Sequence, residues 1–93
     1  MNATTISDDI KAAVDANIKD LMVIIEEELF YDSYLPPVVE YNLTGQAAGY
    51  ALCELNTIRV NPIFLNHNTK HYLEEIIPHE VAHLVAFRLF RIS

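Results

Sequence analysis

Apolar residues recur at every third or fourth position along two long stretches of the chain, which is the spacing of one buried helical face. In the first stretch, Thr5 or Ser7 can cap a helix whose opening turn carries Asp8 and Asp9. The apolar face that follows consists of Ile10, Val14, Ile18, Leu21, Met22, Ile25 and Leu29. We therefore predict an N-terminal helix that packs against the rest of the domain.

The middle of the chain has the alternation of half-buried strands, beginning after Pro36-Pro37. We predict strands at Val38 to Leu43, Ala47 to Glu54 and Ile58 to Val60. Gly49, inside the second of these, indicates a close backbone approach or a bulge. The simplest arrangement of three such strands is an antiparallel meander.

A second helical pattern covers the C-terminal third of the chain. Asn61-Pro62 is a typical helix start and predicts one helical turn, after which Asn68 or Thr69 caps a long helix to Phe90. Its apolar positions are Leu73, Ile76, Ile77, Leu84, Val85 and Leu89. Pro78 lies inside this pattern, so the helix is either kinked there or restarts with Pro78 as its first residue.

Composition limits the protein to one small globular domain. The chain has 93 residues, of which 52 % are hydrophobic. Its single cysteine, Cys53, cannot form an internal disulfide, which fits a reducing, cytoplasmic setting. The N-terminus has no pattern of a signal peptide, and no apolar run is long enough to span a membrane.

The net charge argues against nucleic acid as a partner. Six basic residues stand against thirteen acidic ones, for a net charge of −7. Binding to DNA depends largely on lysine and arginine neutralising phosphates, and no basic stripe is present. Arg88 and Arg91 are better explained by the negative end of the C-terminal helix dipole.

The segment His79-Glu80-Val81-Ala82-His83 lies within the C-terminal helical pattern. Positions i and i+4 share one helix face, so His79 and His83 can both ligate one zinc ion at about 2 Å. Glu80 is rotated off this pair, which suits a general base that does not ligate the metal. Zinc lowers the pKa of a bound water molecule to about 7, so the motif predicts peptide-bond hydrolysis.

Two plainer interpretations of the histidines are weighed against this one. His79 and His83 could be ordinary helix residues, one on the core side and one on the surface. His67 and His71 are also four apart, but they straddle the predicted helix start and no glutamate follows the first of them. We therefore expect His67 and His71 to be surface residues.

Three segments together resemble the SprT family of zinc metallopeptidase-like proteins, which is related to the Spartan protease. They are Gly49-Tyr50-Ala51, Ile58-Arg59-Val60-Asn61-Pro62, and the run from Glu74 through Pro78-His79-Glu80 to Leu84. The resemblance implies an α+β, zincin-like fold with an N-terminal helix, a small three-stranded antiparallel sheet and a C-terminal HExxH helix. It also implies that an edge strand of the sheet holds a protein substrate in extended form.

The chain departs from the family pattern at its end. Catalytic zinc sites have three protein ligands, and in SprT-like proteins the third is a histidine about thirteen residues beyond the second. Only ten residues follow His83, and none is His, Asp, Glu or Cys. The family's C-terminal cysteine-rich region is absent as well. The expectation is a single SprT-like domain, residues 1–93, truncated before the third zinc ligand and inactive alone.

The C-terminal apolar residues lead to a further expectation. Val85, Phe87, Leu89 and Phe90 are predicted to leave an exposed apolar patch through which the chain self-associates. Two functions therefore stay open. The first is zinc-dependent proteolysis of a protein substrate in a longer parent protein, and the second is a non-catalytic interaction or oligomerisation module on the same scaffold.

Overall fold

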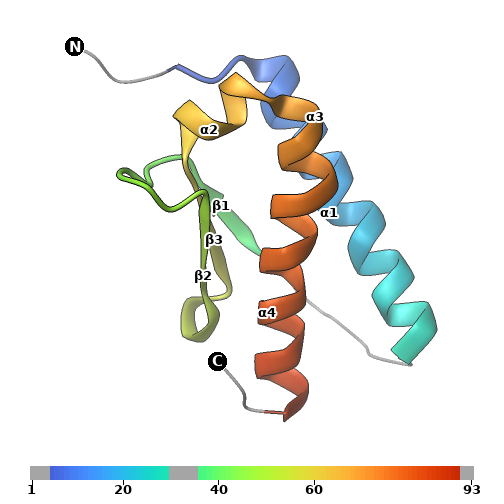
Figure 1. Ribbon diagram of the computed structural model, residues 1–93. Helices are drawn as coiled ribbons and strands as arrows, with labels where there is room; N and C mark the ends of the chain where they lie inside the picture. The colour runs from blue at the N-terminus through green and yellow to red at the C-terminus, as the bar shows by residue number, and fades with distance from the viewer. Residues whose placement is uncertain (1–4, 30–35, 91–93) are drawn as a thin grey trace.

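The computed structural model of the protein describes residues 5–29 and 36–90 (Figure 1). Helix α1 spans Asp8–Leu29. Ser7, one of the two predicted cap residues, caps this helix, because its Oγ accepts the Ile10 N–H at 3.2 Å. The predicted apolar face packs into the core through Ile10, Val14, Ile18, Leu21, Met22 and Ile25. The side chain of Leu29 and the segment 30–35 lie outside the described residues.

The sheet has three short strands in the order β1-β3-β2, which are β1 (Val38–Glu40), β2 (Gly49–Leu52) and β3 (Thr57–Val60). Strand β2 is antiparallel to β3, but β1 runs parallel to β3. The sheet is therefore mixed, and the prediction of an antiparallel meander is wrong.

The connection after β1 explains this topology. Leu43 N–H donates to Val60 O at 3.1 Å, and the Arg59 guanidinium donates to Asn42 through Nε at 2.9 Å. These bonds hold the connection across the end of β3, so the chain enters β2 on the far side of β3 from β1. They also end β1 at Glu40, short of the predicted Leu43.

The turn between β2 and β3 shortens the second predicted strand as well. Cys53–Leu55 forms a short 3-10 turn, η1, and Asn56 follows in the left-handed region with φ 50°. Such a turn reverses the chain directly between antiparallel neighbours, so Cys53 and Glu54 do not belong to β2 as predicted.

The C-terminal third of the chain contains α2 (Pro62–His67), α3 (Thr69–His71), the π-helical segment η2 (Tyr72–Ile76) and α4 (Ile77–Phe90). Asn61 caps α2 and Asn68 caps α3. Segment η2 accounts for Pro78, which has no N–H to bond the preceding turn and whose ring crowds the carbonyl four residues back. A wider turn relieves that conflict, and Ile77 N–H bonds Tyr72 O five residues earlier. Pro78 is therefore the second residue of α4.

Helix α4 packs against both the sheet and α1 (Figure 1). The core between these elements is made by Ile58, Val60, Leu65, Ile77, Val81 and Leu84, with Val14 and Ile18 from α1. Val85 is 6 % exposed, so its predicted exposure is wrong: the helical repeat places it on the inner face with Val81 and Leu84. Leu89 and Phe90 are 37 % and 66 % exposed. Within residues 5–29 and 36–90, no helix is both long enough and apolar enough to cross a membrane.

Candidate active site

Helix α4 brings the imidazole rings of His79 and His83 together. Their Nε2 atoms are 3.0 Å apart, and the ring planes are nearly perpendicular at 89°. Both residues are exposed to solvent. Two imidazole nitrogens therefore converge on one point at the surface of the helix.

This convergence fits two corners of a metal site. Two nitrogens at about 2.0–2.1 Å from a tetrahedral zinc ion are about 3.3 Å apart, close to the observed separation. Within the described part of the chain, no group of three or more His, Cys, Asp or Glu side chains could hold a metal ion. His79 and His83 thus fit as two ligands, and the described residues provide no third.

Glu80 lies between α4 and β2 and is only 8 % exposed. The backbone of Gly49 passes close above it: a Cβ at Gly49 would lie 3.3 Å from Glu80 Cγ and 3.1 Å from Ile76 Cγ2. A side chain at position 49 would require these neighbours to give way by a few tenths of an ångström, so glycine allows the closest approach of the strand to the glutamate. The predicted close backbone approach at Gly49 is confirmed, and it holds the carboxylate beside the histidine pair.

Tyr72 of η2 forms hydrogen bonds to the backbone at the start of β2 and the end of β3. Its hydroxyl donates to Ala48 O and accepts from Asn61 N–H at 3.2 Å. Burial raises the pKa of Tyr72 to about 12, the hydrogen bond from Asn61 opposes this rise, and the charge of Glu80 adds to it. The tyrosine therefore stays protonated and ties the start of β2 to the helix that carries Glu80.

Asn61 completes this support, and sequence reasoning assigned it only a capping role. Its Oδ1 accepts the Ile63 N–H at 3.2 Å, as a cap should. Its Nδ2 also donates to Gly45 O at 3.1 Å and to Ala47 O at 2.9 Å. The buried amide thus fixes the loop that leads into β2. The Asn61-Pro62 pair predicts a helix cap from the sequence. It cannot reveal the bonds from Asn61 to a loop fourteen or more positions earlier.

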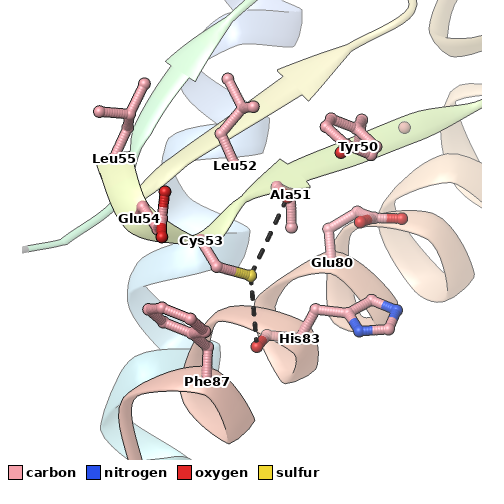
Figure 2. A pocket seen from close by; sticks show the side chains of 10 residues that line it. Tyr50, Ala51, Leu52, Cys53, Glu54, Leu55, Glu80, His83 and Phe87 are labelled. Atoms are coloured by element: carbon pink, nitrogen blue, oxygen red, sulfur yellow. Dashed lines mark hydrogen bonds between the residues drawn. The ribbon is translucent and has the colours of Figure 1, made fainter. Parts of the chain in front are cut away.

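A groove with a volume of about 670 Å³ runs between β2 and α4, and we call it the Glu80 groove (Figure 2). It is lined by Gly49, Tyr50, Ala51, Leu52, Cys53, Glu54, Leu55, Glu80, His83 and Phe87. Figure 2 shows the Glu80 carboxylate and the His83 ring on the same side of the groove. The proposed base and one proposed ligand therefore face the same space.

Cys53 also lines the groove, at the turn that follows β2. Its Sγ donates to His83 O at 3.7 Å and to Ala51 O at 3.9 Å (Figure 2). Burial raises the pKa of the Cys53 thiol, with further contributions from the charges of Glu80 and Glu54. A thiol held protonated is a poor nucleophile. Cys53 therefore acts as a tether between the turn and α4.

Strand β2 presents an open edge to this groove, because β3 is its one strand neighbour among the described residues. Asn61 N–H bonds Ala48 O across the pair at 3.3 Å. Hydrogen-bonded and non-hydrogen-bonded residue pairs alternate along an antiparallel ladder. Since Ala48 bonds to Asn61, the main-chain groups of Tyr50 and Leu52, two and four residues later, also point toward β3. The main-chain groups of Gly49 and Ala51 therefore point to the open edge, where an extended peptide could pair with them.

His67 and His71 are exposed, as predicted for surface residues, and lie near the junction of α2 and α3. Arg88 lies in the last turn of α4, and Arg91 lies outside the described residues. Among the described residues, His67 and His71 do not join His79 and His83 in a group of potential metal ligands.

The fold and this site define a small α+β domain in which a histidine pair and a buried glutamate face an edge strand. The SprT-like family model matches residues 18–93, and the chain belongs to the SprT-like family. It is 41 % identical over 68 residues to Protein SprT of Vibrio parahaemolyticus, covering 73 % of this chain and 41 % of the relative. It is 44 % identical over 64 residues to Protein SprT of Pseudomonas aeruginosa, covering 69 % of this chain and 39 % of the relative.

The chain thus spans about two fifths of the length of these relatives. No solved structure matches it.

Proposed function

We propose that this SprT-like chain carries two zinc ligands, His79 and His83, and the general base, Glu80, of a metallopeptidase with a zincin-like fold. One observation carries the proposal: the His79 and His83 Nε2 atoms lie 3.0 Å apart next to a buried glutamate. The 3.0 Å separation fits a hydrogen bond between the two rings as well as a shared metal ion, and the buried carboxylate next to the pair supports the metal.

The residues have distinct roles in this proposal. Bound zinc would supply Lewis-acid activation of water and of the peptide carbonyl. His79 and His83 would bind the metal through Nε2. The Glu80 carboxylate would accept a proton from the attacking water and return it to the nitrogen of the leaving amine. Burial of Glu80 under Gly49 limits its motion, so the carboxylate is already positioned when substrate arrives.

The open edge of β2 would bind the substrate. A peptide that pairs with Gly49 and Ala51 lies along the Glu80 groove with its main chain next to Glu80. Main-chain pairing does not depend on the substrate's sequence, so it suits an enzyme that acts on unfolded or extended protein segments.

Zinc content tests the proposal. We would compare the chain alone with a chimera that continues it with the remaining C-terminal part of the Vibrio parahaemolyticus relative. The chimera should hold about one zinc ion per chain and should lose it in the H79A and H83A variants. Measurement by mass spectrometry of the metal content, with circular dichroism to verify folding, gives the result.

Hydrolysis of a denatured protein substrate distinguishes the role of the proposed base, Glu80, from that of the two proposed zinc ligands. Glu80→Gln is nearly isosteric and should keep zinc while activity falls by at least a hundredfold. Glu27→Gln is the matched control, because Glu27 is an exposed glutamate on α1 that does not line the Glu80 groove. A folded chimera that holds no zinc, or an E80Q variant with full activity, contradicts the proposal.

A non-catalytic interaction module is the second candidate function. The observation that favours it is that the described residues include two potential metal ligands at this site and no third. A chimera that holds zinc stoichiometrically but hydrolyses no peptide at any rate above the E80Q variant would favour the module.

A further inference from the structure

A second hollow, of about 440 Å³, lies where β2 begins. It is large enough for a side chain of any size, since ligand pockets start at about 300 Å³. Its wall consists mainly of Ala48, Ile63, Phe64, His67, His71 and Ile76, and we call it the Phe64 hollow. No acidic residue lines it, whereas Glu54 and Glu80 line the Glu80 groove.

The Phe64 hollow continues the Glu80 groove past the start of β2 and from α4 back into η2. Ala48 lines the hollow and Gly49, the next residue, lines the groove. Ile76 lines the hollow and Glu80, one helical turn later, lines the groove. Because a Cβ at Gly49 would contact both Ile76 and Glu80, this glycine marks the boundary between the two spaces.

The direction of strand addition decides which part of a substrate reaches the hollow. Antiparallel pairing is the more stable arrangement, and β2 already uses it with β3. A peptide antiparallel to β2 runs from Leu52 toward Gly49 and then past Ala48. Its N-terminal side therefore lies in the Glu80 groove, and its C-terminal side extends to the Phe64 hollow. An extended chain advances about 3.3 Å per residue, so two or three residues of the peptide reach from the Glu80 groove to the Phe64 hollow.

The lining of the hollow indicates which side chain it takes. Ile63 and Phe64 are 62 % and 39 % exposed, so apolar surface is available for burial. Four of the residues that line the hollow have ring side chains: Phe64, His67, His71 and Tyr72. Aromatic rings pair favourably in edge and offset geometries, beyond the gain from buried area. No carboxylate is present that would favour lysine or arginine.

From this we infer that the Phe64 hollow is a specificity subsite for an aromatic side chain, located within the first three residues after the cleaved bond. This inference rests on the proposed function, because it assigns a substrate preference to the same site. It narrows the substrate class to extended peptides with phenylalanine or tyrosine on the C-terminal side of the cleavage point.

Two measurements test the inference. First, the chimera described above digests a denatured protein, and mass spectrometry maps the cleaved bonds. Aromatic residues should be enriched at one of the first three positions after the cut. In the F64A variant, kcat/KM for a peptide with phenylalanine there should fall about ten- to a hundredfold, while its alanine counterpart is unaffected. Ile24→Ser, an exposed apolar residue on α1, is the matched control.

Second, peptide binding to the 93-residue chain itself needs no hydrolysis. Octapeptides of serine and threonine with one central phenylalanine, alanine or lysine would be titrated into isotope-labelled chain and followed by nuclear magnetic resonance. The phenylalanine peptide should shift the amide signals of Ala48, Ile63 and Phe64 more than the other two peptides do.

The outcomes separate the inference from the proposed function. Hydrolysis without an aromatic preference, or a preference that survives F64A, overturns the inference and leaves the proposed function intact. If no peptide is cleaved, the proposed function fails together with the assignment to positions after the cut, and the binding measurement decides whether the Phe64 hollow binds an aromatic side chain. Signal shifts confined to other surfaces, or equal shifts with all three peptides, overturn it.

Discussion

At the scale of single residues, Gly49 controls how close β2 can approach Glu80. Replacing it by alanine places a Cβ at 3.1 Å from Ile76 Cγ2 and 3.3 Å from Glu80 Cγ. Both contacts are tighter than ordinary van der Waals contact, so the side chains of Ile76 and Glu80 must give way by a few tenths of an ångström. We expect Gly49→Ala to lower the free energy of unfolding by about 1–3 kcal/mol, measured by urea denaturation. It should also weaken zinc binding and hydrolysis in the chimera, because Glu80 moves.

Gly45→Ala provides the contrast for this prediction. Gly45 has φ +88°, which is unfavourable for alanine, but a Cβ there would meet nothing within 4 Å. This variant should lose about 1–2 kcal/mol of stability through backbone strain alone. Its zinc content and activity should stay at the level of the parent chimera. Equal functional loss in both glycine variants would show that Gly49 acts only on stability.

The candidate site residues were predictable for a simple reason. His79, Glu80 and His83 belong to one helix, so their relative positions follow from helical geometry alone. Gly49 was predictable as a close approach because a glycine inside a strand pattern has few other uses. Tyr72 was not, because its partners Ala48 and Asn61 are 24 and 11 positions away. Which side chains meet across such distances depends on the topology.

At the scale of elements, Asn61 links the start of α2 to the loop that leads into β2. Asn61→Ala removes the cap bond to Ile63 and leaves the carbonyls of Gly45 and Ala47 without their donor. We expect a loss of about 2–4 kcal/mol in the free energy of unfolding, since a cap is worth about 1 kcal/mol and unsatisfied buried groups cost more. Amide hydrogen exchange should show that protection in β2 falls most.

Asn68→Ala is the matched control for this prediction. Asn68 also caps a helix, accepting the His71 N–H at 3.1 Å, but it is exposed and bonds no distant loop in the part of the chain that the structure describes. It should cost about 1 kcal/mol and leave the protection of β2 unchanged. If both variants lose the same stability, the bonds from Asn61 to the loop contribute nothing beyond the cap.

Element types were predictable from the sequence, but their assembly was not. The helical and alternating patterns report local geometry, and α1, α4 and the three strands follow from them. The parallel pairing of β1 with β3 depends on the bonds of Leu43 and Asn42 to the end of β3. No periodicity in the sequence encodes such bonds. Similarly, Pro78 predicted a disturbance in the helix, while the π-helical form of η2 depends on how neighbouring turns absorb it.

At the scale of the whole molecule, the half-buried Tyr41 and the buried Tyr72 make the free energy of unfolding dependent on alkaline pH. Burial is the largest cause that raises the pKa of both Tyr41 and Tyr72 to about 12. In the unfolded chain the ordinary pKa is near 10, so the folded state holds these protons more tightly. The associated stability is fully present below pH 10 and is lost as the pH rises toward 12.

The expected slope follows from linkage. Each tyrosine lowers the free energy of unfolding by at most about 1.4 kcal/mol per pH unit in this interval. Denaturation of the chain in urea at a series of alkaline pH values measures the combined slope. Tyr72→Phe and Tyr41→Phe should each reduce this slope by about half. The slope is independent of how much either change lowers the free energy of unfolding at neutral pH. The double variant gives the baseline set by the remaining titratable groups, among them the Cys53 thiol, whose pKa burial also raises.

This measurement also tests how the site is coupled to the fold. The ionised Tyr72 could no longer donate to Ala48 O, and its charge would lie near Glu80. The start of β2 should therefore lose hydrogen-exchange protection before the helices do as the pH rises, and Tyr72→Phe should abolish that early loss. Simultaneous loss of protection in β2, α1 and α4 would instead mean that the domain unfolds as one unit. In that case β2, the edge strand that we propose binds substrate, does not open separately.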